Sequence, residues 1–123
     1  MHIYESAEDY LESVLMLEEK QGYVRSIDIA NELNFSKPSV SIAMKKLREN
    51  GYIEMDGNSL ITLTAEGRAI AERVYERHRV LTALLQALGV SPENARADAC
   101  RIEHDLSDES WERIKAHAAK HGL

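Results

Sequence analysis

The sequence predicts a mainly α-helical protein in two parts, with one short β-hairpin near its middle. Two prolines, six glycines and a single phenylalanine among 123 residues argue against a β-sandwich or barrel. Apolar residues recur at helical spacing through most of the chain, and residues 52–63 alone read as strands. We place the boundary between the two parts after residue 73, which gives domains of residues 1–73 and 74–123.

Residues 5–20 are expected to form the first helix. Its buried stripe consists of apolar side chains spaced three and four apart: Tyr10, Leu11, Val14, Leu15 and Leu17. Asp9 and Glu12 lie side by side on a flank of this stripe. Several other acids share the helix, so position alone favours solvated surface for both carboxylates. Gly22 is expected to end the helix.

Two short helices follow at residues 26–33 and 36–50, joined by a turn at Asn34-Phe35. We expect Ser26 and Ser36 to be their N-caps. The inward side chains should be Ile27, Ala30 and Leu33 in the first helix, then Val40, Met44 and Leu47 in the second. Two helices joined by a tight turn have the form of a helix-turn-helix.

The second of these helices offers hydroxyls near its start and cations near its end. Its candidate DNA-binding residues are Ser36, Lys37, Pro38, Ser39, Ser41, Lys45 and Lys46. Hydroxyls and helix N-terminal amides suit phosphates and base edges, lysines suit phosphates, and a proline can contact a thymine methyl group. An ordinary helical hairpin with a polar outer face is the alternative.

Residues 52–63 predict a hairpin about Asp56-Gly57-Asn58, directly after the proposed recognition helix. Such a hairpin is the wing of a winged helix-turn-helix, which decides against the ordinary hairpin of helices. Thr64 should cap a long helix that continues toward His78. The predicted fold is therefore an N-terminal winged helix-turn-helix followed by an all-helical dimerisation domain.

Residues 80–88 are apolar around most of a helical circumference and end at Gly89. Fewer than 40 residues remain to cover them, so we expect a partner subunit to do so. A symmetric homodimer would place two recognition helices about 34 Å apart, one turn of DNA. Ser91 and Ser107 are the expected caps of two further helices, the last with Trp111 and Ile114 inward.

A metal-ligand pattern lies in the helix expected after Ser91. Cys100, Glu103 and His104 stand at i, i+3 and i+4, so they share one helical face. Thiolate, carboxylate and imidazole are all ligands of divalent transition metals, but one helical turn does not complete a site. His117 and His121 are also four apart, and we assign them to a solvated C-terminus.

Composition limits the cellular setting. One cysteine cannot form an intrachain disulfide, no apolar run approaches a membrane span, and Met1–Glu5 has no signal-peptide pattern. We therefore expect a cytoplasmic protein without membrane association. The net charge of −6 disfavours nucleic acid, yet residues 36–48 contain four basic residues and no acid. DNA is not excluded.

Over nearly its whole length the chain resembles the diphtheria toxin repressor and manganese transport regulator family of metal-activated bacterial repressors. The resemblance lies in five segments: Glu8-Asp9-Tyr10-Leu11-Glu12, Ser36-Lys37-Pro38-Ser39-Val40-Ser41, Leu63-Thr64-Ala65-Glu66-Gly67, Arg77-His78-Arg79, and Asp98-Ala99-Cys100-Arg101-Ile102-Glu103-His104. It implies six metal ligands: Asp9, Glu12, His78, Cys100, Glu103 and His104. It also implies a palindromic DNA operator as partner, control of metal uptake genes, and no small organic substrate.

The resemblance is mixed between two branches of the family. Asp9 and Glu12 look like the manganese branch, whereas Cys100 looks like the iron branch. Thr82 and Arg96 stand where the iron branch has ligands of an ancillary site, which argues against that site here. We expect no C-terminal SH3-like domain of the kind that longer members carry, which makes the chain similar to the short manganese regulators. The implied cofactor is Mn²⁺ or Fe²⁺, with Co²⁺ and Zn²⁺ possible in vitro.

The ligands are divided between the two predicted domains, so a bound metal is expected to clamp the domains in one orientation that suits DNA. Two other functions stay open from the residues. The first is a winged-helix regulator that senses redox state through Cys100. The second is a small metal-dependent enzyme, although we see no phosphate-binding loop or nucleophile–base pair and expect no enzyme.

Overall fold

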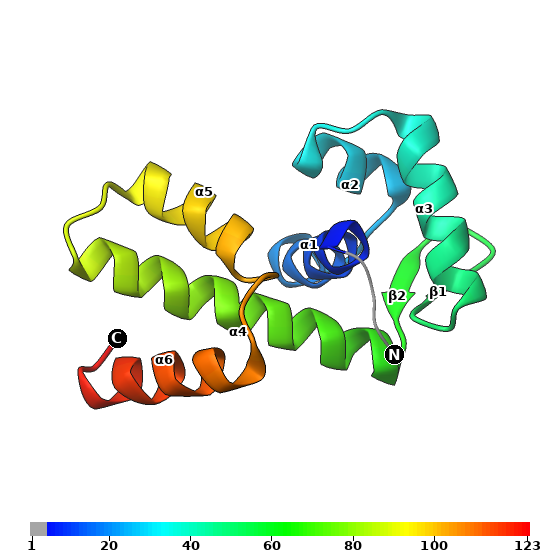
Figure 1. Cartoon of the computed structure of the whole chain (residues 1–123). Coiled ribbons are helices and arrows are strands. Elements are labelled where there is room, and N and C mark those ends of the chain that lie inside the picture. The colour runs from blue at the N-terminus through cyan, green and yellow to red at the C-terminus, as the bar shows by residue number, and fades with distance from the viewer. Residues whose placement is uncertain (1–4) are drawn as a thin grey trace. The chain divides into compact units, whose positions relative to one another are not determined.

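The computed structural model describes residues 5–123; Met1–Tyr4, which fall in the segment without a signal-peptide pattern, lie outside the described residues. Within the described range, the elements follow the predicted order (Figure 1): α1 Glu5–Gln21, α2 Ser26–Leu33, α3 Lys37–Glu49, β1 Ile53–Met55, β2 Ile61–Leu63, α4 Ala65–Ala87, α5 Pro92–Ile102 and α6 Asp108–Lys120. The chain divides within α4 into two compact units, Met1–Glu72 and Arg73–Leu123.

Helix α1 supplies much of the core of the first unit. Its predicted apolar stripe is buried at every position: Tyr10, Leu11, Val14, Leu15 and Leu17. The ring of Phe35, in the turn between α2 and α3, meets Tyr10 edge to face with centroids 5.8 Å apart. The predicted stripe is confirmed, because a sustained helical period leaves one face for burial.

Two details predicted for α2 are wrong. Arg25, not Ser26, is the N-cap, and its backbone N–H donates to Asp28 Oδ2 over 2.9 Å. Ile29 and Ala30 are the buried positions, whereas Ile27 is 38% exposed. The helix packs against neighbours on more than one side, so its buried face is not the simple stripe that spacing suggests.

Helix α3 follows its prediction closely. The Ser36 side chain caps it by accepting from the Ser39 N–H over 3.3 Å. Val40, Met44 and Leu47 are buried as expected. Gly51 takes a left-handed φ of 80° just beyond the helix, a conformation that glycine adopts without steric cost.

The wing is a short antiparallel hairpin in which Ile53 pairs with Leu63 and Met55 with Ile61. Its loop is organised by Asp56, whose Oδ1 accepts from the N–H groups of Asn58 and Leu60 over 2.8 and 3.0 Å. Ser59, rather than Gly57, is the left-handed residue, with φ of 62°. The hairpin is confirmed, and its loop is longer than the Asp-Gly-Asn turn suggested.

The first turn of α4 packs closely against Gly51 and Tyr52, the residues that precede the wing. Thr64 caps it as predicted: its hydroxyl accepts from the Gly67 N–H over 3.1 Å and donates to the Gly51 carbonyl over 2.7 Å. A Cβ built on Gly67 would overlap the carbonyl oxygen of Tyr52. Glycine is therefore required at this position by close backbone approach.

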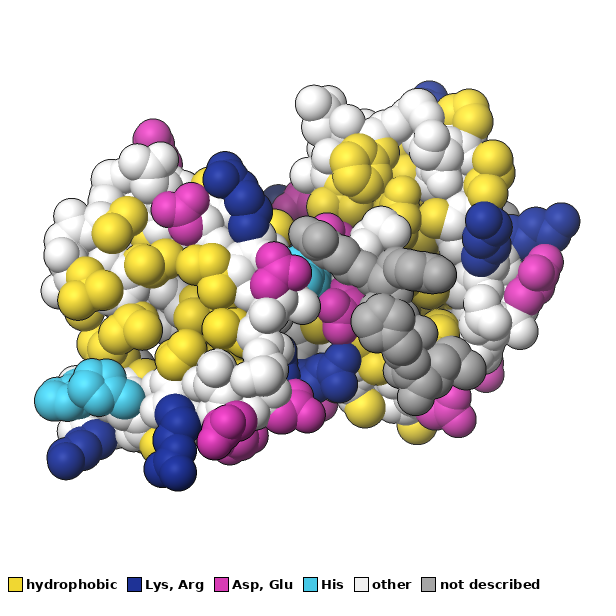
Figure 2. Space-filling view, in the orientation of Figure 1, with side chains coloured by type: hydrophobic (Ala, Val, Ile, Leu, Met, Phe, Trp, Pro, Cys, Tyr) yellow, Lys and Arg dark blue, Asp and Glu magenta, His cyan; other side chains and the backbone are white. Residues whose placement is uncertain are grey.

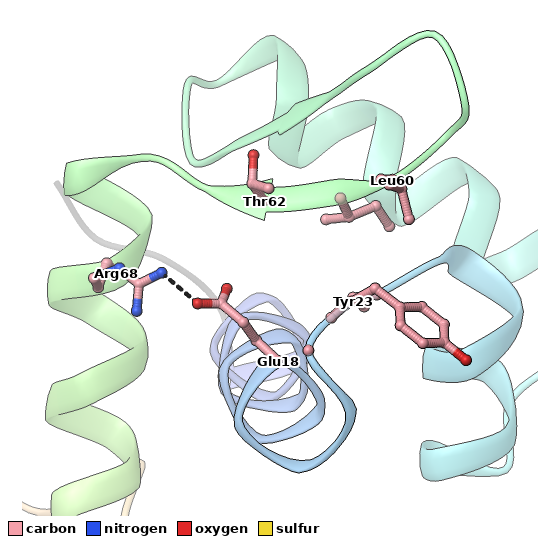
Figure 3. A pocket seen from close by; sticks show the side chains of 8 residues that line it. Glu18, Tyr23, Leu60, Thr62 and Arg68 are labelled. Atoms are coloured by element: carbon pink, nitrogen blue, oxygen red, sulfur yellow. Dashed lines mark hydrogen bonds and ion pairs between the residues drawn. The ribbon is translucent and has the colours of Figure 1, made fainter.

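The first unit also contains a cavity of about 300 Å³ between the end of α1, the wing and the start of α4. Arg68 donates to Glu18 across 2.9 Å at one side of it, while Tyr23 and Leu60 lie at the other (Figure 3). Both ion-pair side chains are more than a third exposed, so water screens this contact. The ion pair links α1 to α4.

In the second unit, α5 and α6 pack along the later turns of α4 (Figure 1). Its buried apolar residues are Val74, Leu81, Ala95, Ala99, Trp111 and Ala118. Lys115 of α6 lies 3.0 Å from Glu76 of α4, and this hydrogen bond and the charge of Glu76 raise the pKa of Lys115. Ser91 and Ser107 are N-caps, as predicted.

The apolar stretch at the end of α4 is poorly covered within the chain. Leu81 alone is buried among residues 80–88, and Leu88 is 72% exposed. Figure 2 shows hydrophobic side chains gathered on this unit between α5 and α6. No helix among residues 5–123 has both the length and the apolar character needed to cross a membrane.

Candidate metal centre and nucleic-acid interface

Four of the six predicted metal ligands gather in the second unit. Cys100 Sγ, a carboxylate oxygen of Glu103 and an imidazole nitrogen of His104 all lie within 4.8 Å of one another. His78, projecting from α4, places Nδ1 3.2 Å from Glu103 Oε2, and His104 Nε2 lies 3.4 Å from Glu103 Oε1. Glu103 therefore stands between two imidazoles.

The donor set fits a divalent transition metal. One thiol, one carboxylate and two imidazoles match the ligands that such ions take in proteins, and Glu103 is 2% exposed. A bound cation would compensate the charge of this buried carboxylate. Sequence spacing indicated three members of this group, and His78 was implied only by the family resemblance.

The helical setting of these ligands differs from the prediction. Helix α5 ends at Ile102, so Glu103 is its C-cap and His104 belongs to the following turn. The Glu103 N–H still bonds to the Ala99 carbonyl over 3.0 Å, and its φ and ψ stay helical. The i, i+3, i+4 spacing therefore still gathers the side chains, although the last two lie past the helix.

The other two predicted ligands, Asp9 and Glu12, lie one turn apart on α1 in the first unit. Glu12 is only 7% exposed, which disfavours the interpretation of this carboxylate as solvated surface. Asp9 is half-buried. Burial, and after it the negative charge of Asp9, raises the pKa of Tyr10 between them.

The predicted DNA-binding residues form one exposed surface on α3 and its cap: Ser36, Lys37, Pro38, Ser39, Ser41, Lys45 and Lys46. Figure 2 shows Lys and Arg side chains over this part of the first unit. The Ser36 hydroxyl donates to Ser39 Oγ over 2.7 Å at the N-terminus of the helix. The surface is polar and cationic while the opposite face is core.

Sequence reasoning missed Ile42, which is 59% exposed on this surface. It lies two residues from Val40 and from Met44, about 200° around the helix from each. The same 3.6-residue period that identified the core could have identified it. A large apolar side chain opposite the core, one turn from Pro38, stands among the cationic and hydroxyl groups.

Known proteins match both halves of the chain. Residues 2–59 match the family described as iron dependent repressor, N-terminal DNA binding domain. Residues 64–120 match iron dependent repressor, metal binding and dimerisation domain. The transcriptional regulator MntR of Escherichia coli O6:H1 is 39% identical over 121 residues, which is 98% of this chain and 78% of that protein.

The chain belongs to the iron-dependent repressor family. An uncharacterised HTH-type transcriptional regulator of Methanocaldococcus jannaschii is 34% identical, and the match covers 94% of this chain and 94% of that protein. This repressor also resembles the solved structure of T. acidophilum IdeR, with 27% identity and a TM-score of 0.80 over 100% of its length and 56% of that chain. It spans about half the length of that solved chain.

A second solved relative is described as a manganese-dependent transcriptional repressor in complex with manganese. It is 31% identical, with a TM-score of 0.81 over 92% of this repressor and 52% of that chain. One further relative, ScaR, is described with bound Zn²⁺ and with bound Cd²⁺, so the family binds divalent metals.

Family membership confirms several predictions. The repressor is a metal-dependent transcriptional regulator with a DNA-binding domain and a metal-binding and dimerisation domain. The predicted fold, mainly helical with a two-stranded wing, agrees with this assignment. Because the family consists of transcriptional regulators, the prediction that the chain is not an enzyme is also confirmed.

Proposed function

We propose that the repressor is a homodimer that binds a palindromic operator in the cytoplasm when it holds Mn²⁺ or Fe²⁺, and that it controls metal uptake genes. The observation that carries this proposal is the cluster of His78, Cys100, Glu103 and His104 in a chain whose other half is a DNA-binding domain. The relative described as manganese-dependent supports Mn²⁺, and the family description as iron dependent repressor supports Fe²⁺.

We further propose that Asp9 and Glu12 complete the metal site begun by the four donors of the second unit. The bound ion would supply positive charge that offsets repulsion between carboxylates. Donors on both units would then hold the units in one relative orientation. Without that restraint the recognition helices would sample many separations, and few would fit both half-sites.

The proposal of a homodimer is supported by the uncovered apolar side chains of the second unit, of which Leu88 is the most exposed. A surface of this kind is stable in water when a second copy covers it. Sedimentation of the purified chain should give twice the monomer mass at micromolar concentration. A monomer in the presence of Mn²⁺, Fe²⁺ and operator DNA would contradict this part.

The decisive experiment starts from random duplex DNA, from which the protein selects its own binding site in the presence of metal. Affinity for that site is then measured for metal-free protein and after addition of Mn²⁺, Fe²⁺, Co²⁺ or Zn²⁺. We expect binding to require metal and the site to be palindromic. Tight binding restored by a thiol reductant alone, with all metal chelated, would instead support redox sensing through Cys100.

A further inference from the structure

Arg77 has an unusual set of partners for a guanidinium. It is 8% exposed on α4, and its Nη1 donates to the carbonyl oxygens of Glu103 and Leu106 over 3.3 and 3.4 Å. Its Nη2 donates to Asp108 Oδ1 over 3.1 Å. Its guanidinium carbon Cζ lies over the Trp111 ring, 5.5 Å from the ring centroid. Every partner lies within residues 103–111.

These contacts hold the segment that connects α5 to α6 against α4. The last carbonyls of a helix have no partner within the helix, and a cation at that end satisfies them. Arg77 does this for Glu103, the C-cap of α5, and reaches Asp108 in the first turn of α6. Asp108 is 96% exposed in its side chain, so the buried carbonyl contacts matter more than this ion pair.

The segment held by Arg77 carries two of the proposed metal ligands, Glu103 and His104. The next residue of α4, His78, contacts the Glu103 side chain at 3.2 Å. Two successive residues of one helix therefore hold the main chain and the side chain of the same glutamate. Residues 103–105 form a turn with backbone hydrogen bonds from Glu103 to Ala99 and from Asp105 to Ile102, and the contacts of Arg77 and His78 add to them.

We propose that Arg77 is a positioning residue of the metal centre: it fixes the backbone of residues 103–106 so that Glu103 and His104 are preorganised for a divalent ion. This rests on the proposed function, because it takes these two residues as ligands. Partners that orient metal ligands commonly change metal affinity by tenfold to a hundredfold when they are removed. Arg77 acts through main-chain carbonyls and does not itself touch the ion.

The test compares Arg77→Lys and Arg77→Met with wild type. Lysine keeps the charge but cannot reach two carbonyls and a carboxylate together, and methionine keeps only the aliphatic contact. Arg79→Met is the matched control, because Arg79 is the exposed neighbouring arginine. Ile114→Ala, on a half-buried position of α6, controls for lost stability in the same unit.

Three quantities are measured: Co²⁺ affinity, the sulfur-to-cobalt charge-transfer absorption of Cys100, and amide exchange of residues 103–107 in metal-free protein. Both Arg77 variants should bind Co²⁺ tenfold to a hundredfold more weakly and exchange these amides faster. The two controls should keep wild-type affinity, even where Ile114→Ala lowers the unfolding temperature.

The outcomes separate this proposal from the one on which it rests. Wild-type Co²⁺ affinity in both Arg77 variants, or an equal loss in Ile114→Ala, would overturn the role of Arg77 and leave the metal centre standing. Failure of the wild-type protein to bind Co²⁺, or binding that Glu103→Gln leaves unchanged, would overturn both.

Discussion

In the proposed metal centre, single donor atoms of Glu103 and Cys100 should decide which ion is preferred. Glu103 has an imidazole on each side, at 3.2 Å from His78 and 3.4 Å from His104. Cys100 adds the one soft donor of the cluster. Thiolate favours Fe²⁺, Co²⁺ or Zn²⁺ over Mn²⁺, whereas carboxylate favours Mn²⁺. In the proposed metal centre, the metal response should therefore depend most on position 100.

We predict that Cys100→Glu shifts the metal response toward Mn²⁺. The change replaces sulfur with an oxygen donor that can also bridge ions, which suits the harder cation. Operator binding titrated with Mn²⁺, Fe²⁺, Co²⁺ and Zn²⁺ measures the ranking for both proteins. Cys100→Ser, a smaller and weaker oxygen donor, controls for simple loss of the thiol. An unchanged ranking of the four ions would count against sulfur ligation.

Ile42 supports a second prediction at the residue scale. Its exposed side chain lies on the outer face of α3, where it can reach a thymine methyl group in the major groove. Ile42→Ala should weaken operator binding. Replacement of one thymine per half-site by uracil should weaken wild-type binding about 15-fold, as expected for two buried methyl groups of about 0.8 kcal/mol each.

The two changes should not add, because each removes one side of the same contact. Affinities of wild type and Ile42→Ala for the selected operator, with thymine and with uracil, give the coupling. Ile27→Ala is the control, since Ile27 is an exposed isoleucine on α2, outside the recognition helix. If the losses of affinity from Ile42→Ala and from uracil add fully at every thymine of the operator, Ile42 does not contact a thymine methyl group.

At the scale of elements, the junction of the wing and α4 depends on one close approach. The Tyr52 carbonyl accepts from the Thr64 N–H over 3.1 Å and lies against Gly67. A side chain at Gly67 would have to push the wing segment and the helix start apart. The glycine in Thr64-Ala65-Glu66-Gly67 is therefore structural, and it sets where the wing lies on the first unit.

We predict that Gly67→Ala destabilises the protein by about 1–3 kcal/mol, or more if the backbone cannot shift. Urea unfolding of metal-free protein measures the loss. Gly57→Ala is the matched control, because nothing lies within 4 Å of a Cβ placed at Gly57 and its φ is not left-handed. Equal stability of the two variants would show that the junction relaxes freely.

At the scale of the molecule, the proposed function links protons, metal and DNA. Metal ligands must lose their protons to bind, so metal affinity falls as pH falls through the range where histidine and thiol are protonated. Operator affinity at fixed, subsaturating Mn²⁺ should therefore decrease from pH 8 to pH 6. A chelator should abolish specific binding at either pH.

The control for this prediction is binding to non-specific duplex DNA, which we propose to rest on phosphate contacts by residues such as Lys45 and Lys46. Lysines stay charged throughout the range, so non-specific affinity should change little with pH or chelator. Parallel losses of specific and non-specific binding would show that the pH effect lies outside the metal centre.

The sequence by itself determined what depends on neighbours along the chain. Helical period fixed the stripe of α1 and the core face of α3, and short-range capping fixed Ser36, Thr64, Ser91 and Ser107. The spacing of Cys100, Glu103 and His104 gathered three donors even though α5 ends before the last two. Local hydrogen bonds and side-chain direction carry this information.

Tertiary structure alone decided the contacts between distant segments. Ile29 rather than Ile27 is buried, because packing of α2 against its neighbours chooses the face. His78 meets Glu103, and Arg77 meets the carbonyls of Glu103 and Leu106, across 25 to 29 residues. Gly67 is required because a distant carbonyl approaches it. Such contacts are fixed only when the elements pack, and no local pattern records them.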